Sequence, residues 1–328
     1  MLLVAIVAAV PWPYACPASA SVDDIARTIH LPSHTVVVTG ADGRSGFQLV
    51  RAAALVNASV ILVGRNKSKI SAAAASVRAE LPGAKLFTQI FDLSSFTQTA
   101  KGAKAIVAAH PSIDVLINNA GAIANELSDD GMVGTWQVNA FAPALLAAVL
   151  EPALRRAPAP RIINVATANV YDPLPANHSA AAFLQYARAT PRLPGFGDYG
   201  ASKLALVHYT KLQATRIKGL LSVSVNPGYF RTPPFTPQQR AACDGPHAQL
   251  RFRPCPQLPA QGAASTAFAA LTPGLDAAAG SLIDFATNLT QPWSQGGETC
   301  VPRPLPPWDD ADADAWYDTV QRVVRPFV

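Results

Sequence analysis

The chain of 328 residues has a net charge of +5, and 50% of its residues are hydrophobic while 14% are charged. This charged fraction lies well below the roughly 25% of an average globular chain, so the composition excludes extensive disorder and allows a large core. The basic residues are scattered, and the densest group, Arg251-Phe252-Arg253, is too short for a nucleic-acid-binding stripe.

The first 20 residues differ in composition from the rest of the chain. An apolar run over 2–10 is followed by two prolines and by the small residues Ala18-Ser19-Ala20, although no Lys or Arg precedes the run. The pattern predicts a cleaved secretory signal or an uncleaved anchor at a membrane surface, and the run is too short to span a bilayer. A signal would place the protein in the endoplasmic reticulum or outside the cell. Without it, the protein would be cytoplasmic or membrane-associated.

The cysteines are few, and Cys16 lies within this leader. In an oxidising compartment Cys243 and Cys255 would form the plausible disulfide, with Cys300 as an alternative partner. Neither the cysteines nor the scattered histidines have the spacing of metal ligands, so we expect no metal site.

Beyond the leader, short apolar β-branched runs alternate with segments of helical spacing. The predicted strands cover 35–38, 59–63, 86–91, 115–117, 161–165 and 221–225, and the predicted helices cover 45–55, 68–79, 96–109, 136–154 and 199–217. This alternation predicts an α/β fold with a doubly wound parallel sheet of the Rossmann type. We expect a single domain over 33–328, with substrate loops at 168–198 and 233–260 and no further segment able to span a membrane.

The turn after the first predicted strand is rich in glycine and opens the first helix. Glycines in this place allow a tight turn and let backbone N–H groups approach a pyrophosphate at the helix N-terminus. We therefore expect the turn to bind a dinucleotide through Thr39, Gly40, Arg44, Ser45 and Gly46.

Arg65 follows the second predicted strand, 65 − 40 = 25 residues after Gly40. An NAD site usually carries an acidic residue roughly 20 residues after the glycine turn, where it binds the ribose 2′-hydroxyl. A guanidinium stands here without a carboxylate beside it, which favours a 2′-phosphate. The expected cofactor is therefore NADP(H), with NAD(H) as the alternative.

Tyr199 and Lys203 lie four residues apart, so on a helix they share one face. An ammonium beside a phenol favours the phenolate and lowers the phenol's pKa from about 10. The pair is typical of a general acid/base near neutral pH.

The glycine turn and the Tyr199/Lys203 pair belong to a longer series of motifs over 35–285, whose order and spacing are typical of one enzyme family. The further motifs are Asp92-Leu93, Asn118-Asn119-Ala120-Gly121, Asn139, Asn164-Val165-Ala166-Thr167, and Pro227-Gly228 with Thr232. Together they resemble the short-chain dehydrogenase/reductase family. The resemblance implies that Asp92 and Leu93 contact the adenine end of the cofactor. It also implies that Asn119 and Gly121 stabilise the sheet beside the cofactor, and that Pro227, Gly228 and Thr232 lie near the nicotinamide.

Three features resemble the retinol-dehydrogenase-like and WW-domain-oxidoreductase-like branch of this family. They are the interval of 199 − 167 = 32 residues between Thr167 and Tyr199, the segment 60–66, and a tail over 307–324 like that branch's closing helix. The branch implies NADP(H) chemistry on lipophilic alcohols, aldehydes or ketones.

Two positions depart from the family pattern. The middle glycine falls at Arg44, which could crowd the phosphates or bind them, while Gly43 could adopt the unusual backbone angle. The family's catalytic serine falls at Thr167, which keeps a hydroxyl donor and acceptor, so we expect activity to survive.

The resemblance implies a role for each residue of the expected catalytic group. Tyr199 exchanges a proton with the substrate oxygen, Lys203 contacts the nicotinamide ribose, Thr167 hydrogen-bonds the substrate oxygen, and Asn139 anchors a water connected to Lys203. Two other functions stay open: a catalytically weak dinucleotide-binding sensor or scaffold, and a sugar-nucleotide epimerase or dehydratase. The short region after Thr232 disfavours the latter. The sequence leaves the oligomeric state open.

Overall fold

The structure is a computed structural model that describes residues 21–27, 29–167, 170, 179–188, 197–227, 259–287, 296–303, 305 and 308–328. The leader 1–20, the pair Cys243 and Cys255, and the cofactor candidates Gly228 and Thr232 lie outside these residues. The expectations about targeting, the disulfide and these two site residues therefore stay predictions.

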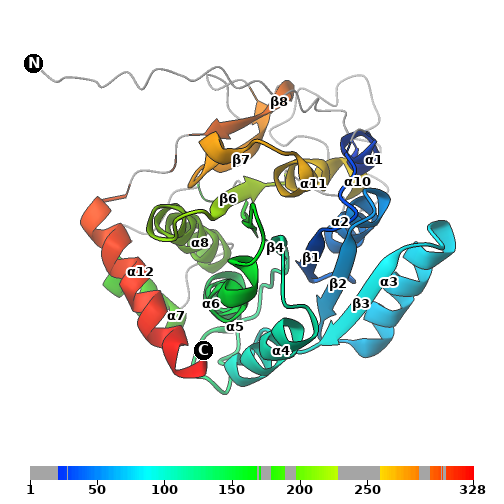
Figure 1. Ribbon diagram of the computed structural model, residues 1–328. Coiled ribbons are helices and arrows are strands. Elements are labelled where there is room, and N and C mark those ends of the chain that lie inside the picture. The colour runs from blue at the N-terminus through cyan, green and yellow to red at the C-terminus, as the bar shows by residue number, and fades with distance from the viewer. Residues whose placement is uncertain are drawn as a thin grey trace, which may run out of the picture.

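The fold is built on one eight-stranded sheet with the strand order β3-β2-β1-β4-β5-β6-β7-β8 (Figure 1). The strands from β1 to β7 are parallel, and β8 pairs antiparallel with β7. Their bounds are β1 Thr35–Thr39, β2 Ser59–Gly64, β3 Lys85–Ile90, β4 Val115–Asn118, β5 Arg161–Val165, β6 Leu221–Asn226, β7 Leu282–Thr287 and β8 Gly296–Arg303. The predicted doubly wound parallel sheet is confirmed.

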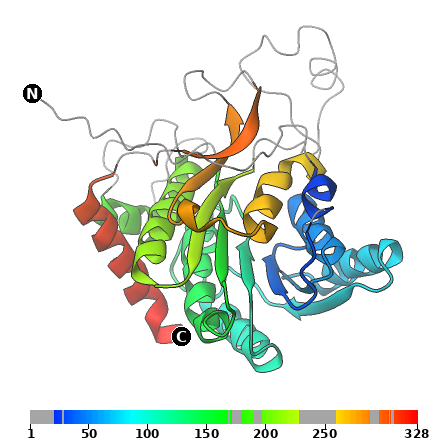
Figure 2. The same cartoon turned by 45° about the horizontal axis from the view of Figure 1, so that its top comes forward.

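Helices cover both faces of the sheet. On one face lie α1 (Val22–Ala26), α2 (Arg44–Leu55), α3 (Lys67–Glu80), α10 (Pro259–Gly262) and α11 (Ala264–Leu271). On the other lie α4 (Phe96–Ala109), α5 (Gly134–Trp136), α6 (Ala142–Leu154), α7 (Ala180–Arg188), α8 (Gly197–Arg216) and α12 (Asp310–Val324). In both views α3 and α12 lie at opposite ends of the molecule (Figures 1 and 2).

The predicted elements agree with the structure except at a few places. The predicted loop over 168–198 is wrong in its middle, because α7 forms there. The sequence of α7, AAAFLQYAR, favours a helix, and its Phe183 is fully buried against two tryptophans, Trp136 and Trp316. The strands β7 and β8 were not predicted, and β8 adds the antiparallel edge.

The predicted helix 136–154 contains a π-helical turn at Gln137–Phe141, between α5 and α6. Contrary to expectation, the segment Gly134–Leu154 has the length and hydropathy of a membrane-spanning helix. However, 83% of its most apolar window is buried inside the protein, so it serves as a core helix.

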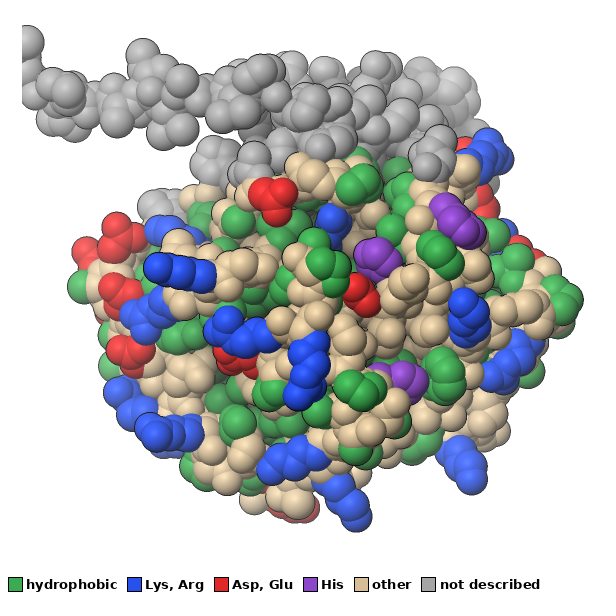
Figure 3. Space-filling model, viewed as in Figure 1, with side chains coloured by type: hydrophobic (Ala, Val, Ile, Leu, Met, Phe, Trp, Pro, Cys, Tyr) green, Lys and Arg blue, Asp and Glu red, His purple; other side chains and the backbone are tan. Residues whose placement is uncertain are grey.

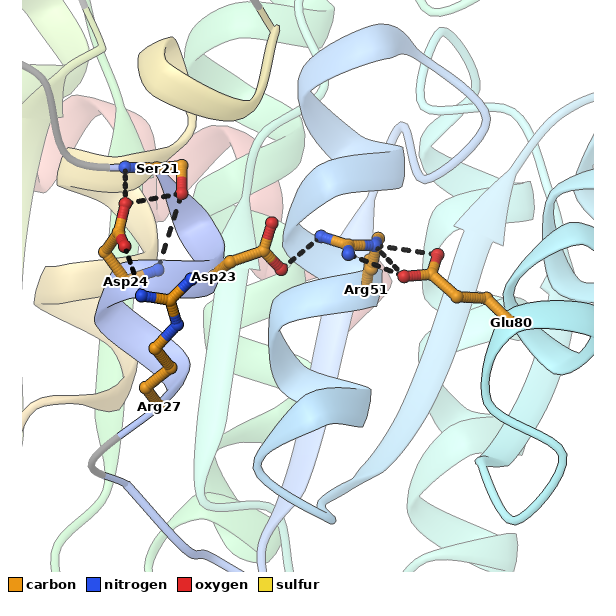
Figure 4. Close-up of polar contacts among 6 residues, drawn as sticks. All are labelled: Ser21, Asp23, Asp24, Arg27, Arg51 and Glu80. Carbon is orange, nitrogen blue, oxygen red and sulfur yellow. Dashed lines mark hydrogen bonds and ion pairs between the residues drawn. The ribbon is translucent and has the colours of Figure 1, made fainter.

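The short helix α1 is attached to its neighbours through Arg51 in the middle of α2 (Figure 4). The Arg51 guanidinium donates to Asp23 of α1 and, through Nε, to both carboxylate oxygens of Glu80 in α3 at 2.7 and 2.8 Å. A capping box between Ser21 and Asp24 begins α1. One arginine thus links three helices that cover the same face of the sheet.

The C-terminal helix α12 confirms the expected closing helix and packs on α8. Arg216 of α8 pairs with Asp314 and Asp318 at 2.7 Å each, and its guanidinium lies 4.5 Å from the centre of the Tyr317 ring. The Tyr317 ring stacks on Tyr209 of α8 at 4.9 Å.

In Figure 3 Lys and Arg side chains are spread across the visible face, with Asp and Glu side chains between them.

Candidate active site

Most of the predicted site residues follow strand ends at one edge of the sheet. Thr39 ends β1, Arg65 follows β2, Asp92 follows β3, Asn119 follows β4 and Thr167 follows β5. The carboxyl ends of parallel strands meet at the same edge, which is where open α/β sheets bind ligands. Pro227, buried at the end of β6, belongs to the same edge.

The glycine turn is tight enough to exclude side chains at two positions. Gly40 has a φ of +62°, and a Cβ there would lie 3.0 Å from the Ala120 Cα. A Cβ on Gly46 would lie only 2.0 Å from the Gly40 carbonyl oxygen. The expectation that Gly43 could take the unusual angle was wrong: its φ is −75°, and Gly40 makes the left-handed turn where the chain leaves β1.

The N-terminus of α2 has the properties of an anion site. No side chain caps the helix, and its first turn holds no acidic residue. The Ser45 Oγ is buried without a hydrogen-bond partner among the described residues, while Arg44 is exposed at the first helical position. Uncapped N–H groups, the helix dipole and an orphaned hydroxyl fit the phosphates of a dinucleotide. Arg44, being exposed, does not fill this turn.

Asn119 joins the end of β4 to the glycine turn. Its Nδ2 donates to the Thr39 carbonyl at 2.9 Å and to the Gly40 carbonyl at 3.4 Å. The Thr39 hydroxyl donates to the Ile117 carbonyl at 3.3 Å and accepts from the Ala120 N–H at 3.0 Å. Asn119 and Thr39 thus connect the end of β4 to the glycine turn through hydrogen bonds, while the expected role of Asn119 beside a cofactor stays a prediction.

The end of β2 carries two opposite charges. Arg65 is exposed and forms no ion pair with any described residue. A Cβ built on Gly64 would lie 2.9 Å from Oδ1 of Asp42, so this carboxylate also reaches the strand end. Asp42 was not predicted as a site residue, although an acidic residue inside the glycine turn is a visible signal in the sequence.

At the end of β3, Asp92 is held in place by its own turn. Its Oδ1 accepts from the Ser94 N–H at 2.9 Å and from the Ser94 hydroxyl at 2.8 Å. Leu93 is buried and packs into the core on the α4 face. The expected contact of both residues with adenine stays a prediction.

Lys203 on α8 is one of the largest fully buried side chains among the described residues. Its Nζ donates to the Val165 carbonyl at 2.6 Å, at the end of β5. The position of a Cβ on Gly121 lies 3.7 Å from this Nζ, which places the lysine amine beside the loop after β4. Burial lowers the pKa of Lys203 to about 7, because desolvation penalises the charged form.

Tyr199 and Thr167 are joined by a side-chain hydrogen bond, so α8 brings the tyrosine to the end of β5. Burial raises the pKa of Tyr199 above its usual value, and the bond to Thr167 opposes this effect. The expectation that Lys203 would lower the tyrosine pKa is therefore not met in this state. A lysine with a pKa of about 7 is about half neutral at neutral pH, and its amine faces the Val165 carbonyl.

Asn139 lies in the π-helical turn and is completely buried. Its Oδ1 accepts from the Ala122 N–H at 2.8 Å, and its Nδ2 donates to the Ala122 carbonyl at 2.9 Å and to the Ser202 hydroxyl at 3.1 Å. The Ser202 hydroxyl in turn donates to the Tyr199 carbonyl at 2.8 Å. Asn139 thus fixes both the loop after β4 and the first turn of α8, and its expected water stays a prediction.

Within the described part of the chain, no group of three or more His, Cys, Asp or Glu residues is placed to hold a metal ion. The described polar groups at this edge are an uncapped helix N-terminus, a buried amine, a phenol and two hydroxyl groups.

Comparisons with known proteins agree with this arrangement. The sequence model of the short chain dehydrogenase family matches residues 34–182. Human retinol dehydrogenase 13 is 31% identical over 224 residues, which are 66% of this chain and 62% of that protein. Human WW domain-containing oxidoreductase is 28% identical over 273 residues, 80% of this chain and 64% of that protein. This chain thus spans less than two thirds of the length of both relatives.

Two further matches extend this finding. A short-chain dehydrogenase/reductase of Armillaria gallica is 31% identical over 223 residues, 64% of this chain and 69% of that protein. The solved structure of an uncharacterized protein from Mycobacterium paratuberculosis has the same fold, with a TM-score of 0.69, 22% identity, and coverage of 95% of this chain and 98% of that one. The chain therefore belongs to the short-chain dehydrogenase/reductase family, and its relatives include proteins of the retinol-dehydrogenase-like branch.

Proposed function

We propose that this protein is an NADP(H)-dependent oxidoreductase that interconverts a small, lipophilic alcohol and its aldehyde or ketone. The observation that carries the proposal is the hydrogen bond between Tyr199 and Thr167, one helical turn from the buried amine of Lys203. Burying the Lys203 amine lowers the free energy of unfolding. A buried lysine beside the loop after β4 is therefore better explained by a catalytic role than by a structural one.

In the proposed mechanism the cofactor supplies or accepts a hydride at its nicotinamide ring. During carbonyl reduction the Tyr199 hydroxyl gives its proton to the substrate oxygen. Thr167 donates a hydrogen bond to the same oxygen and stabilises the negative charge that develops there. The raised pKa of Tyr199 keeps the phenol protonated, which is the form that carbonyl reduction needs.

Lys203 and Asn139 assist in this mechanism without contacting the carbonyl carbon. When protonated, Lys203 would donate to the ribose beside the nicotinamide and favour the phenolate that remains on Tyr199 after proton transfer. Asn139 fixes the first turn of α8 through Ser202, and it would anchor the water that returns a proton to Lys203.

The residues that would bind the pyrophosphate and the adenosine ribose of the cofactor follow the first two strands, β1 and β2. The N-terminus of α2 with Ser45 would bind the pyrophosphate, and the glycines at 40 and 46 allow its close approach. Arg65 would bind a 2′-phosphate, which favours NADP(H) over NAD(H). The similarity to human retinol dehydrogenase 13, whose name refers to a lipophilic alcohol, supports a lipophilic substrate.

A dinucleotide-binding sensor or scaffold with weak turnover is the second candidate. Arg44 at the first position of α2, where the family has glycine, favours it, because a bulky residue stands next to the phosphate site.

The test is an assay of NADPH oxidation by the wild-type protein with decanal, a long-chain methyl ketone and all-trans-retinal, alongside the variant Tyr199→Phe. Without the phenolic proton the variant should lose at least about two orders of magnitude in kcat, the lower end of the range for general acid–base catalysis. NADPH affinity, measured by fluorescence titration, should stay within about twofold because the ring is retained. Equal turnover by both proteins would disprove the role of Tyr199.

A protein that binds NADPH tightly but reduces none of the three carbonyl compounds, and oxidises none of the matching alcohols with NADP, would favour the sensor. A protein that binds neither NADPH nor NADH would contradict both candidates.

A further inference from the structure

The first turn of α8, which carries Tyr199, has fewer intrahelical hydrogen bonds than the rest of the helix. Tyr199 is the third residue of this helix, and the N–H groups of a first helical turn have no intrahelical acceptor. Helix ends open more readily than helix centres, so the hydroxyl of Tyr199 would move with them. The structure must therefore contain contacts that hold this turn.

One such contact joins Trp136 to Asp198, the residue before Tyr199. The Trp136 Nε1–H donates to Asp198 Oδ1 at 3.0 Å, and both side chains are buried, with exposed fractions of 0% and 8%. A carboxylate in the first turn also interacts favourably with the helix dipole. A hydrogen bond from an indole to a carboxylate is charge-assisted, and such bonds are roughly twice as strong as bonds between two neutral groups.

The indole itself is fixed by aromatic rings from two other helices. The Trp136 ring lies 5.4 Å from Phe183 of α7 and 6.4 Å from Trp316 of α12, measured between ring centres. Trp136 also directly precedes the π-helical turn that carries Asn139. This one segment therefore holds α8 twice: Trp136 binds Asp198, and Asn139 binds Ser202.

We propose that Trp136 and Asp198 are a positioning pair, which fixes the first turn of α8 and thereby the hydroxyl of Tyr199 against Thr167. The proposal rests on the proposed function and adds two residues to it. Neither residue exchanges a proton with the substrate. The pair also connects the tyrosine to α12, since Trp316 packs on the indole.

The test compares Trp136→Phe with Trp308→Phe, which makes the same chemical change in a neighbouring residue. Trp308 packs on Phe183 and His208, but its indole N–H has no hydrogen-bond partner among the described residues. Trp136→Phe should lower kcat for carbonyl reduction roughly tenfold, as expected for one lost hydrogen bond to a charged group, while the NADPH dissociation constant changes less than about twofold. Trp308→Phe should leave both constants within about twofold.

Variants of the carboxylate separate the hydrogen bond from the charge. Asp198→Asn keeps an oxygen that can accept from the indole, so kcat should stay within about threefold of wild type. Asp198→Ala removes the acceptor and should lose as much as Trp136→Phe, and the double variant Trp136→Phe with Asp198→Ala should lose no more than either alone. A kcat for Trp136→Phe equal to that of Trp308→Phe, or losses for Asp198→Asn as large as for Asp198→Ala, would overturn the proposal.

A second measurement does not depend on turnover. In hydrogen exchange of the free protein, Trp136→Phe should speed up exchange at residues 201–204, whose amides close the first turn of α8, and should leave α6 unchanged. Trp308→Phe should alter neither region. If the wild-type protein reduces no carbonyl compound, the proposed function is disproved. The positioning pair is disproved separately, by unchanged hydrogen exchange at residues 201–204 in Trp136→Phe.

Discussion

The two halves of the candidate site are built in different ways. The glycine turn between β1 and α2 depends on what is absent: no Cβ fits at Gly46, and no side chain caps the helix. The region of Tyr199 and Lys203 depends on side chains that are present, buried and hydrogen-bonded across several helices and strands. The turn can therefore be damaged by adding a single carbon, whereas the catalytic region is damaged by removing a polar group.

The largest expected effect comes from Lys203→Met. The variant should lose carbonyl reduction entirely. Below pH 7, however, its free energy of unfolding should exceed that of the wild type. Lowering the pKa of Lys203 from 10.5 to about 7 corresponds to about 5 kcal/mol, and losing the bond to the Val165 carbonyl offsets about 1 kcal/mol of this. Urea unfolding at several pH values measures the difference.

The sign of the pH dependence follows from the direction of this shift. Between pH 7 and 10.5 the unfolded chain binds a proton on residue 203 that the folded protein does not, so the contribution of Lys203 to wild-type stability rises with pH across this range. The advantage of Lys203→Met should therefore be full below pH 7 and should vanish near pH 10.5. The control is Lys211→Met, an exposed lysine of the same helix, whose stability should follow wild type within about 1 kcal/mol. A constant difference at all pH values would contradict the assigned burial cost.

Much of the first half could be predicted from sequence because its function depends on local pattern. The run Val36–Val38, the glycines after it and the helix that follows form a continuous segment, and strand, turn and helix each have their own signal. Even so, the residue in the left-handed conformation was assigned wrongly between Gly40 and Gly43. That choice depends on the contact with Ala120, which is 80 residues away in the chain.

The second half was only partly predictable, because its contacts join distant segments. Tyr199 and Lys203 could be recognised by their helical spacing, but nothing in the sequence pairs Trp136 with Asp198 or Asn139 with Ser202. The pKa of Tyr199 was predicted in the wrong direction for a related reason. The spacing indicates which charge is near, whereas the burial that dominates depends on the whole fold.

Gly46→Ala tests the part of the site that depends on an absent side chain. Its Cβ would lie 2.0 Å from the Gly40 carbonyl oxygen, and backbone cannot move aside as a side chain can. We expect a loss of roughly 3 kcal/mol in the free energy of unfolding, typical of overpacking, together with loss of NADPH binding. Gly83→Ala is the matched control, because a Cβ added there would meet no atom within 4 Å and the backbone of Gly83 needs no positive φ. Equal stability of the two variants would show that the turn has room to relax.

Two variants at the end of β2, Arg65→Ala and Asp42→Asn, should have the smallest effects, and Asp42→Asn the smaller of the two. The exposed guanidinium should contribute about tenfold to NADPH affinity and little to NADH affinity, because only NADPH carries the 2′-phosphate. Asp42→Asn should act in the opposite direction: its carboxylate reaches Gly64, so removing the charge should raise the affinity for NADPH relative to NADH by about a few-fold.

Fluorescence titration with both cofactors measures these ratios, and Lys69→Ala, which removes an exposed cation on the neighbouring helix, is the control for net charge. If Arg65→Ala weakens both cofactors equally, Arg65 supports the turn rather than the phosphate. The charged end of β2 would then resemble the catalytic half, where side chains hold the fold in shape.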